Sequence, residues 1–396
     1  MGLGKTFTGA EKMKELGAKI NLIVCQKSKV DDWMTHLDNN YDWHLFDLTS
    51  TKNLECFLHA CNDNSYHHVI GVINYDLVFR RKELSQLTDF TLMLDESSLI
   101  QNPKAKRTKF IMKMQPKNVI LLSGTPTGGK YENLLTQMNL LGWKITETTF
   151  WNQYVEWEWN ETADGFWQKK ITGYKNEERM KRKMRQHGCD FLKTDEVFDL
   201  PNQIDQTIKI PIIKEYTKFK KNDYLEIGDD ELIGDTILTK MLHERQLCGW
   251  YNSEKLSAFQ DLIESTDDRL IVFYNFNAEL DALKHISDSL GRDSSIINGQ
   301  DKDLYAYDNI DNSITFVQYQ AGAMGLNLQK ANKIIYFSPP LSSELFEQSK
   351  KRIHRIGQDR PCFYYYLVCS NSIEEKIYAT LAKRKDYTDE LFKGGD

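Results

Sequence analysis

The stretch Thr91-Leu92-Met93-Leu94-Asp95-Glu96 is an almost unbroken apolar run that ends in two acids. A strand with one face in water alternates apolar and polar residues, whereas a strand covered by helices on both faces is apolar nearly throughout. This run therefore predicts a buried strand of a parallel sheet. Seven further runs have the same character: Ile20–Cys25, Val69–Asn74, Val119–Leu122, Leu270–Tyr274, Ile314–Gln318, Ile334–Phe337 and Phe363–Val368.

Segments with helical periodicity lie between these runs, and alternating strands and helices predict a doubly wound α/β fold. The helical segments are Ser28–Leu37, Tyr131–Leu141, Leu256–Glu264, Ala278–Leu290 and Ile373–Lys383. The pattern breaks between about residues 150 and 255, a polar stretch that we predict to be mainly helical, with a turn at Leu200-Pro201-Asn202 and a strand-like run at Ile208–Ile213. We therefore predict two parallel-sheet lobes, 1–149 and 256–396, separated by a helical insertion and linker at 150–255.

The composition is that of a folded protein of ordinary polarity. The 396 residues suffice for two domains, and 40% are hydrophobic and 27% charged. No apolar run reaches the ~18–20 residues that a membrane span needs. The net charge of −6 argues against a protein coated in basic surface. The segment 169–185 is locally basic, and it is either a solvated helix face or a surface that contacts a nucleic-acid backbone.

The seven cysteines show no C-x-x-C pair. Cys56 and Cys61 have His59 between them, but buried or free thiols explain this spacing better than a metal site does. This usage indicates a reducing, intracellular compartment. The few added segments and the Lys-, Asn-, Ile- and Tyr-rich composition lead us to expect the cytoplasm of a bacterial or phage-infected cell.

The segment Met1-Gly2-Leu3-Gly4-Lys5-Thr6 matches both a myristoylation signal and the end of a phosphate-binding loop. In such a loop, glycines let backbone N–H groups approach the phosphates at a helix N-terminus. Lys5 would then neutralise the β- and γ-phosphates, and Thr6 would hold Mg²⁺. The motifs in the rest of the chain favour the loop.

Two further groups of polar residues follow apolar runs in the first half of the chain. We assign Asp95 to the metal and Glu96 to the general base that takes a proton from the attacking water. An ordinary acidic strand end is the alternative. Ser123-Gly124-Thr125-Pro126 follows the next run, where the hydroxyls would lie at the ligand-binding edge of a parallel sheet, although a plain Gly-Pro turn also fits.

The second half carries a compact basic string. Gln348 is followed by Arg352 and Arg355, which are three residues apart and would share one face of a helix. Two guanidinium groups on one face can meet the charge that develops on a γ-phosphate. The alternative, a generic basic helix, is weakened by the tight string His354-Arg355-Ile356-Gly357-Gln358.

Taken in order, these motifs resemble those of superfamily-two helicases, and specifically the Swi/Snf family of double-stranded-DNA translocases. The string from His354 to Gln358 is the most specific feature, and the resemblance covers nearly the whole chain, least closely at 150–250. The matching segments are Met1–Thr6, Val24–Trp33, Asn74–Asp76, Asp95–Asn102, Ser123–Pro126, Leu200–Pro201, Ser253–Leu256, Ile271–Phe276, Asn298–Gly299, Ala321–Leu328 and Gln348–Gln358.

The resemblance implies two RecA-like lobes, ATP and Mg²⁺ as cofactors, and double-stranded DNA as the partner. The implied nucleotide-binding residues are Gly2, Leu3, Gly4, Lys5, Thr6 and Gly325, with Thr6 and Asp95 at the metal. The implied catalytic residues are Asp95, Glu96, Gln348 and two arginine fingers, Arg352 and Arg355. Residues implied at or beside the DNA track are Lys27, Ser28, Tyr75, Asn275, Asn298 and Gly322, and those implied in coupling are Ser123 and Thr125.

Three positions depart from the family pattern. The acidic box usually reads Asp-Glu-Ala-His, but Ser97 and Ser98 replace its last two residues. Position 98 therefore lacks an imidazole that could link the nucleotide and DNA sites. Gly128 stands where the family often has Asn, and Ser338-Pro339-Pro340 replaces a common Trp-Asn-Pro turn.

The family places a strand and an adenine-contacting segment before the phosphate loop, so we expect the natural protein to be longer or its start site to have been placed late. The predicted function is ATP-driven translocation on double-stranded DNA. A strand-separating helicase or restriction-type motor is one alternative. A DNA-binding module that has lost ATPase activity is another.

Overall fold

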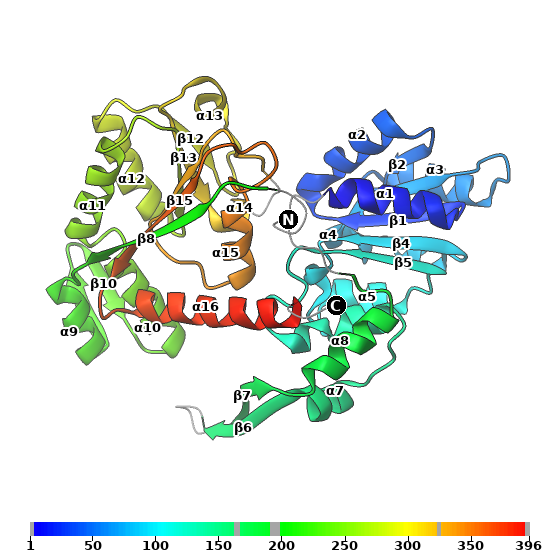
Figure 1. Ribbon diagram of the computed structural model, residues 1–396, viewed down its shortest axis with the longest axis horizontal. Coiled ribbons are helices and arrows are strands. Elements are labelled where there is room, and N and C mark those ends of the chain that lie inside the picture. Colours follow the sequence, from blue (N-terminus) through cyan, green and yellow to red (C-terminus); the bar gives the residue numbers. More distant parts are fainter. Residues whose placement is uncertain (1–3, 162–166, 191–198, 323–325, 393–396) are drawn as a thin grey trace. The chain divides into compact units, whose positions relative to one another are not determined.

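Two parallel sheets organise the chain in a computed structural model that describes residues 4–161, 167–190, 199–322 and 326–392 (Figure 1). The chain divides into two compact units, one built mainly from Met1–Lys193 and the other from Thr194–Lys385. This division falls inside the predicted insertion, and the domain boundaries given above stay a prediction. In the part of the chain that is described, no helix is both long and apolar enough to cross a membrane.

The first unit contains a five-stranded parallel sheet in the order β2-β3-β1-β4-β5. Its strands are β1 (Ile20–Cys25), β2 (His44–Asp47), β3 (Val69–Asn74), β4 (Phe90–Asp95) and β5 (Asn118–Leu122). The helices and turns around it are α1 (Lys5–Leu16), η1 (Lys27–Lys29), α2 (Val30–Asn40), α3 (Thr51–Asn62), α4 (Tyr75–Val78), η2 (Lys82–Gln86), η3 (Ser97–Ile100) and α5 (Lys106–Lys113).

Strand β1 shows why these runs are apolar throughout. Successive side chains of a strand point to opposite faces of the sheet. Leu22 and Val24 pack into one hydrophobic cluster, whereas Ile23 and Cys25 pack into another. Both faces of the sheet are therefore covered, which confirms the interpretation of the unbroken apolar runs as strands of a parallel sheet.

Helix α1 lies against the sheet at a glycine. A Cβ atom added to Gly9 would lie 2.7 Å from the Met93 sulfur and 2.8 Å from Leu122 Cδ1. Both distances are far shorter than van der Waals contact, so only glycine fits here without a shift. This contact holds the N-terminus of α1 at the edge of the sheet where β4 and β5 end.

We expect the Gly9→Ala variant to unfold more easily, by up to about 2 kcal/mol, because overpacking of the core by about 1–3 kcal/mol exceeds the gain of about 1 kcal/mol in helix propensity. Urea unfolding of the variant and the parent chain measures this difference. Gly299→Ala is the matched control, because a Cβ at Gly299 meets nothing within 4 Å. A Gly9→Ala variant more stable than the parent would mean that α1 lies farther from β4 and β5.

The first unit also holds a small additional core that follows the sheet. It is built from η4 (Tyr131–Leu134), α6 (Leu135–Leu140), α7 (Glu147–Tyr154), β6 (Val155–Glu161), β7 (Trp167–Tyr174) and α8 (Glu177–Gln186). Strands β6 and β7 pair antiparallel. The prediction of a helical insertion was therefore wrong for this segment, because its alternating tryptophans and charges form a two-stranded ribbon rather than a helix face.

The second unit contains a six-stranded parallel sheet in the order β12-β13-β11-β14-β15-β8. Its strands are β8 (Gln203–Ile210), β11 (Leu270–Tyr274), β12 (Ser294–Ile297), β13 (Ile314–Gln318), β14 (Lys333–Tyr336) and β15 (Cys362–Cys369). The other elements are α9 (Lys214–Asn222), β9 (Tyr224–Ile227), β10 (Asp230–Ile233), α10 (Ile237–Cys248), α11 (Ser253–Glu264), α12 (Asn277–Ser289), α13 (Tyr305–Asn309), α14 (Tyr319–Gly322), α15 (Ser343–Lys350) and α16 (Ile373–Phe392).

The two sheets confirm the expected pair of RecA-like lobes. All eight predicted strands are present, while β2 and β12 were missed because only two of the four residues in each are apolar. Strand β8 lies in the predicted linker, yet it pairs with β15 along its full length, from Cys362↔Gln203 to Cys369↔Ile210. Residues 203–210 therefore belong to the second sheet rather than to a connection.

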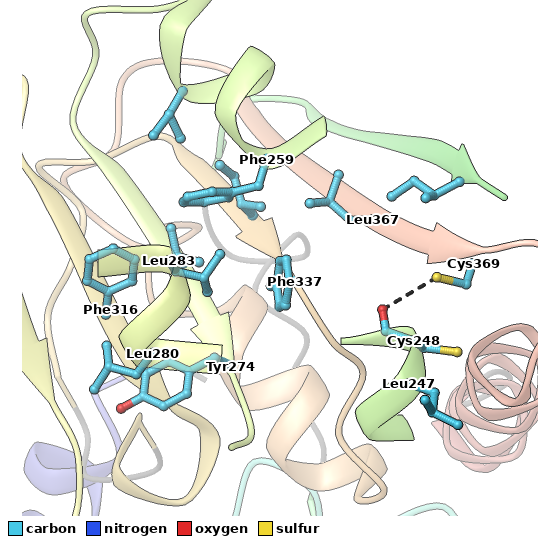
Figure 2. Close-up of a cluster of buried hydrophobic side chains, with 14 of the residues drawn as sticks. Leu247, Cys248, Phe259, Tyr274, Leu280, Leu283, Phe316, Phe337, Leu367 and Cys369 are labelled. Carbon is cyan, nitrogen blue, oxygen red and sulfur yellow. Dashed lines mark hydrogen bonds between the residues drawn. The ribbon is translucent and has the colours of Figure 1, made fainter. Parts of the chain in front are cut away.

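The core of the second unit joins its helices to its sheet (Figure 2). Figure 2 shows Phe337 beside Phe259 of α11, and the two rings meet edge to face. In the same region the Cys369 thiol lies 3.5 Å from the Cys248 carbonyl oxygen. A fully buried ion pair, Lys255 to Glu374 at 2.6 Å, ties α11 to the start of α16. Lys255, which lies in the family-matched segment Ser253–Leu256, thus has a structural role.

Candidate nucleotide site

The predicted lysine and acids of the first unit lie together although they are far apart in the sequence. Lys5 begins α1, and Glu96 follows β4. The Lys5 ammonium nitrogen lies 3.3 Å from Glu96 Oε2, and both side chains are mostly buried. A phosphate group placed at α1 would compete with Glu96 for this lysine.

Asp95 is the last residue of β4 and is held by a tryptophan. The Trp33 indole Nε1 donates a hydrogen bond of 2.9 Å to Asp95 Oδ2. Burial raises the pKa of Asp95, while the nearby Lys5 charge and the Trp33 hydrogen bond oppose this rise. A bound divalent cation would reinforce the ionised form in the same way as Lys5 does.

Glu96 is fixed by hydroxyl groups as well as by Lys5. Its Oε1 accepts hydrogen bonds from Ser123 at 3.1 Å and from Ser98 at 3.4 Å. The backbone of Glu96 is in the left-handed region, with φ 60°. Such a conformation is unfavourable for a residue with a Cβ and is typically retained where it positions a functional side chain.

The predicted coupling residues Ser123 and Thr125 occupy the loop after β5. The Thr125 backbone N–H donates to Ser123 Oγ at 3.1 Å, so Ser123 bridges this loop and Glu96. The Thr125 hydroxyl is buried, and no partner for it is present in the described part of the chain. It is therefore available to a group that enters from the edge of the sheet.

Tyr75, predicted at or beside the DNA track, has almost no exposed surface for a direct DNA contact. Its side chain is buried, and its hydroxyl donates to the carbonyl oxygens of Asp95 at 3.1 Å and Glu96 at 3.4 Å. A buried phenol cannot itself touch a phosphate backbone, so Tyr75 supports the segment Asp95–Glu96 instead, and its place beside the DNA track stays a prediction. Lys27 is exposed and Ser28 half-buried on η1, which leaves both open to a partner.

Sequence reasoning missed Gln137, which connects the acidic segment to the loop after β5. Its Oε1 accepts from Ser97 Oγ at 2.8 Å, and its Nε2 donates to the Pro126 carbonyl at 2.8 Å. It also missed the role of Trp33. Trp33 lies in a segment matched to the family, but no spacing rule connects Gln137 to Ser97, 40 residues away.

The start of α1 has the chemistry of a phosphate site. Gly4 precedes the helix with φ 69°, and a Cβ atom added there would meet nothing within 4 Å. The first N–H groups of a helix have no intrahelical partners and attract anions. Lys5, Thr6 and Asp95 thus supply the ammonium, hydroxyl and carboxylate that a nucleotide and its Mg²⁺ require. Gly2 and Leu3 lie outside the described residues.

In the second unit, one prediction about the arginines was wrong. Helix α15 ends at Lys350, so Arg352 and Arg355 lie in the turns that follow and do not share a helix face. Arg352 is buried and donates to the Leu326 carbonyl at 3.5 Å. Arg355 is only half-buried and donates to Asn327 Oδ1. Both arginines are thereby tied to the segment Leu326–Leu328.

The most specific string of the sequence has a structural explanation. His354 Nε2 lies 3.0 Å from the Pro201 carbonyl oxygen. The Gln358 side-chain amide donates to the carbonyls of Gln329 and Ala331, at 3.1 and 2.8 Å. These contacts fix the turns that carry Arg352 and Arg355.

The remaining predicted residues of the second unit have local partners. Gln348 is buried on α15, where its amide lies 3.3 Å from Glu344. Asn275 donates to Ser338 Oγ at 2.8 Å, and Asn298 Oδ1 accepts from the backbone N–H groups of Gln300 and Asp301. Gly322 ends α14. Gly325 lies outside the described residues.

Comparisons with known proteins agree with these motifs. The family model of the SNF2-related domain matches residues 1–252, and that of the helicase conserved C-terminal domain matches residues 254–357. The chain is 22% identical, over 98% of its length, to the Drosophila melanogaster SWI/SNF-related matrix-associated actin-dependent regulator of chromatin subfamily A-like protein 1. It is 24% identical, over 99% of its length, to the putative ATP-dependent helicase/translocase YwqA of Bacillus subtilis (strain 168).

The chain spans 52% and 46% of the lengths of these two relatives. Among solved structures, the Sulfolobus solfataricus SWI2/SNF2 ATPase core in complex with dsDNA aligns with 100% of this chain and 87% of its own. That alignment has 20% identity and a TM-score of 0.43.

Proposed function

The chain belongs to the SNF2-related family of helicase-like ATPases, and from this premise we propose that it hydrolyses ATP to move along double-stranded DNA. The observation that carries the proposal is the convergence of Lys5, Asp95, Glu96 and Ser123 at the edge of the first sheet. These side chains come from α1, from the end of β4 and from the loop after β5.

The roles in ATP hydrolysis follow from the position of each group. The N-terminus of α1 and Lys5 hold the β- and γ-phosphates of ATP, and Lys5 leaves Glu96 when it binds them. Mg²⁺, held by Thr6 and Asp95, supplies neutralisation of the phosphate charge when bound. Glu96 then accepts the proton of the attacking water, with its carboxylate oriented by Ser123 and Ser98.

The second unit contributes the arginines. We assign Arg355 to the stabilisation of charge on the γ-phosphate, because it is the more exposed arginine of the pair. Arg352 is buried against Leu326 and supports the same turns. ATP that gains contacts from both lobes favours their closure, and hydrolysis removes the shared γ-phosphate and reverses the closure.

The second element of the proposal is duplex DNA. Lys27 and Ser28 on η1 lie next to the sheet edge that carries the nucleotide site. A change at the nucleotide site can therefore move the DNA-contacting residues. Backbone contacts of this kind are independent of sequence and weaken steeply with salt. If each lobe holds the backbone in turn, alternating closure moves the DNA stepwise.

An ATPase assay of the full chain with blunt duplex DNA tests the proposal. We expect the hydrolysis rate to rise to saturation with duplex concentration, and the apparent DNA affinity to fall steeply with salt. The Lys5→Ala variant should lose turnover and keep DNA binding. No stimulation by any duplex would overturn the proposal. DNA binding without turnover, indifferent to Lys5→Ala, would instead support a binding module.

Movement and strand separation need different substrates. Displacement of a third strand from a triplex, without unwinding of a forked duplex, is the result expected of a translocase. Unwinding of the fork would support the strand-separating alternative.

A further inference from the structure

The ribbon formed by β6 and β7 presents tryptophans on one face. Direct cross-strand partners share a face, and so do residues two apart on a strand. Trp157 pairs with Ile171, Trp159 with Lys169, and Glu161 with Trp167. Trp157, Trp159 and Trp167 therefore lie on the same face. Trp159 and Trp167 are 57% and 63% exposed, although aromatic side chains of this size are normally buried.

A lysine stands among these rings. The Lys169 ammonium group lies 4.0 Å from the centroid of the Trp157 ring and 5.3 Å from that of Trp151. Trp157 and Trp159 meet edge to face with centroids 5.5 Å apart. Glu161 adds one carboxylate to this face, while Glu158 and Lys170 pair with each other on the opposite face. The tryptophan face thus combines flat rings with a cation.

The base of the ribbon leads into a basic helix. Met180 and Met184 of α8 are buried, whereas Arg179, Arg182 and Arg185 are exposed at intervals of three residues. Residues at this spacing form a stripe on one helix face. Between Trp167 and His187 the chain has eight Lys and Arg residues and only two acids, against a net charge of −6 for the whole chain.

An open pocket joins the end of β7 to α8. Its lining includes Tyr174 and the cations Lys175, Arg179 and Arg182, as well as Glu177 and Glu178. Glu178 is paired with Lys181 at 2.8 Å, and Glu177 accepts a hydrogen bond from the Tyr131 hydroxyl at 2.9 Å. Lys181 balances the charge of Glu178, so Lys175, Arg179 and Arg182 face only the remaining charge of Glu177, and the pocket is positive on balance.

The ribbon is anchored rather than loosely attached. Tyr154, Val155 and Met180 belong to one buried cluster, against which Trp157 and Ile171 pack. Figure 1 shows the ribbon projecting from α7 and α8. Trp157 thereby links the anchored base of the ribbon to the exposed Trp159 ring, which it meets edge to face.

We propose that this tryptophan face binds unpaired bases of a DNA strand, whose phosphates are held by Lys175 and the arginine stripe of α8. Bases stack on exposed aromatic rings, and this needs base faces that a duplex keeps stacked on each other. The positive charge of α8 and the end of β7 complements the negative charge of a phosphate backbone. The proposal rests on DNA as the partner, and it adds a preference for single-stranded ends or gaps to the proposed motor.

Fluorescence anisotropy of the full chain with a labelled oligothymidine tests this site. We expect the Trp159→Ala/Trp167→Ala double variant to bind the single strand at least about thirty-fold more weakly, as the loss of two stacking rings predicts. Trp159→Phe/Trp167→Phe keeps two rings and should retain most of the affinity. Arg179→Ala/Arg182→Ala should reduce the salt dependence of binding by about two phosphate contacts.

Tyr305→Ala removes an aromatic ring that is 72% exposed in the second unit, and it should bind the single strand as the parent does. Circular dichroism shows whether each variant is folded. Unchanged affinity in the double alanine variant, equal loss in Tyr305→Ala, or no single-strand binding by the parent would each overturn the proposal.

The same variants separate this site from the motor. ATPase stimulation by blunt duplex should be unaffected by Trp159→Ala/Trp167→Ala, because no unpaired base is present. If no duplex stimulates hydrolysis but the tryptophans still govern single-strand binding, the translocase proposal fails and the tryptophan face stands. If duplex stimulates hydrolysis but the tryptophans do not affect single-strand binding, the proposal for the tryptophan face fails and the translocase proposal stands.

Discussion

Replacing Glu96 by glutamine is expected to lower kcat for ATP hydrolysis by about 10²- to 10⁴-fold, the usual contribution of a general base. Glutamine has the size of glutamate and can still accept hydrogen bonds from Ser123 and Ser98. It cannot take the proton of the attacking water. It also removes the charge that lies 3.3 Å from Lys5, so the lysine is left to the phosphates and ATP affinity should stay equal or rise.

Single-turnover hydrolysis and binding of a fluorescent ATP analogue measure the two effects separately. Glu55→Gln is the matched control, because Glu55 is an exposed carboxylate on α3 and is not among the side chains that contact Lys5, Asp95 or Ser123. We expect it to hydrolyse ATP at the parent rate. A Glu96→Gln variant with the parent kcat would show that another group activates the water.

Replacing Arg355 by alanine is expected to lower kcat by about 10³- to 10⁵-fold, the range found for arginines that stabilise phosphoryl transfer. The first unit holds the phosphates through α1 and Lys5, so nucleotide binding should be largely kept. Arg355 is half-buried and bonded to Asn327, and the turns that carry it are fixed by Gln358. Its removal should therefore leave the second unit folded.

Hydrolysis by Arg355→Ala is measured beside Arg360→Ala, which removes an exposed arginine a few residues along the chain. Arg360→Ala should hydrolyse ATP normally. Arg352→Ala should lose activity and also stability, because Arg352 is buried against the Leu326 carbonyl. If Arg355→Ala kept the parent kcat, the stabilising charge would have to come from another side chain.

The parallel sheets could be predicted because their signal is local. Each of the eight strands was recognised from its own unbroken run of apolar residues. Strand β1 shows why the run is unbroken, because the side chains on its two faces pack into two different hydrophobic clusters. Strand β12 gave too little signal because only half of its residues are apolar. Only the end of β8 was recognised, within the strand-like run Ile208–Ile213, because most of its other residues are exposed. Its strand conformation depends on pairing with β15, which lies far along the sequence.

The candidate site was predictable as a set of residues but not as a set of contacts. Lys5, Asp95, Glu96 and Ser123 were chosen from motifs, and they do lie together. The burial of Tyr75 and the bridge made by Gln137 could not be derived, because they depend on how α4 and α6 pack. We inferred from their spacing that Arg352 and Arg355 share a helix face. This inference failed because α15 ends at Lys350, before either arginine.

The amino-acid sequence alone determined the fold class, the family and the residue types of the nucleotide site, because apolar runs and short motifs are properties of neighbouring residues. Only the tertiary structure decided that Ser123 and Lys5 share Glu96, that His354 and Gln358 fix the arginine turns, and that tryptophans face solvent on a ribbon. These features depend on contacts between distant segments, and register and packing in the folded chain set those contacts.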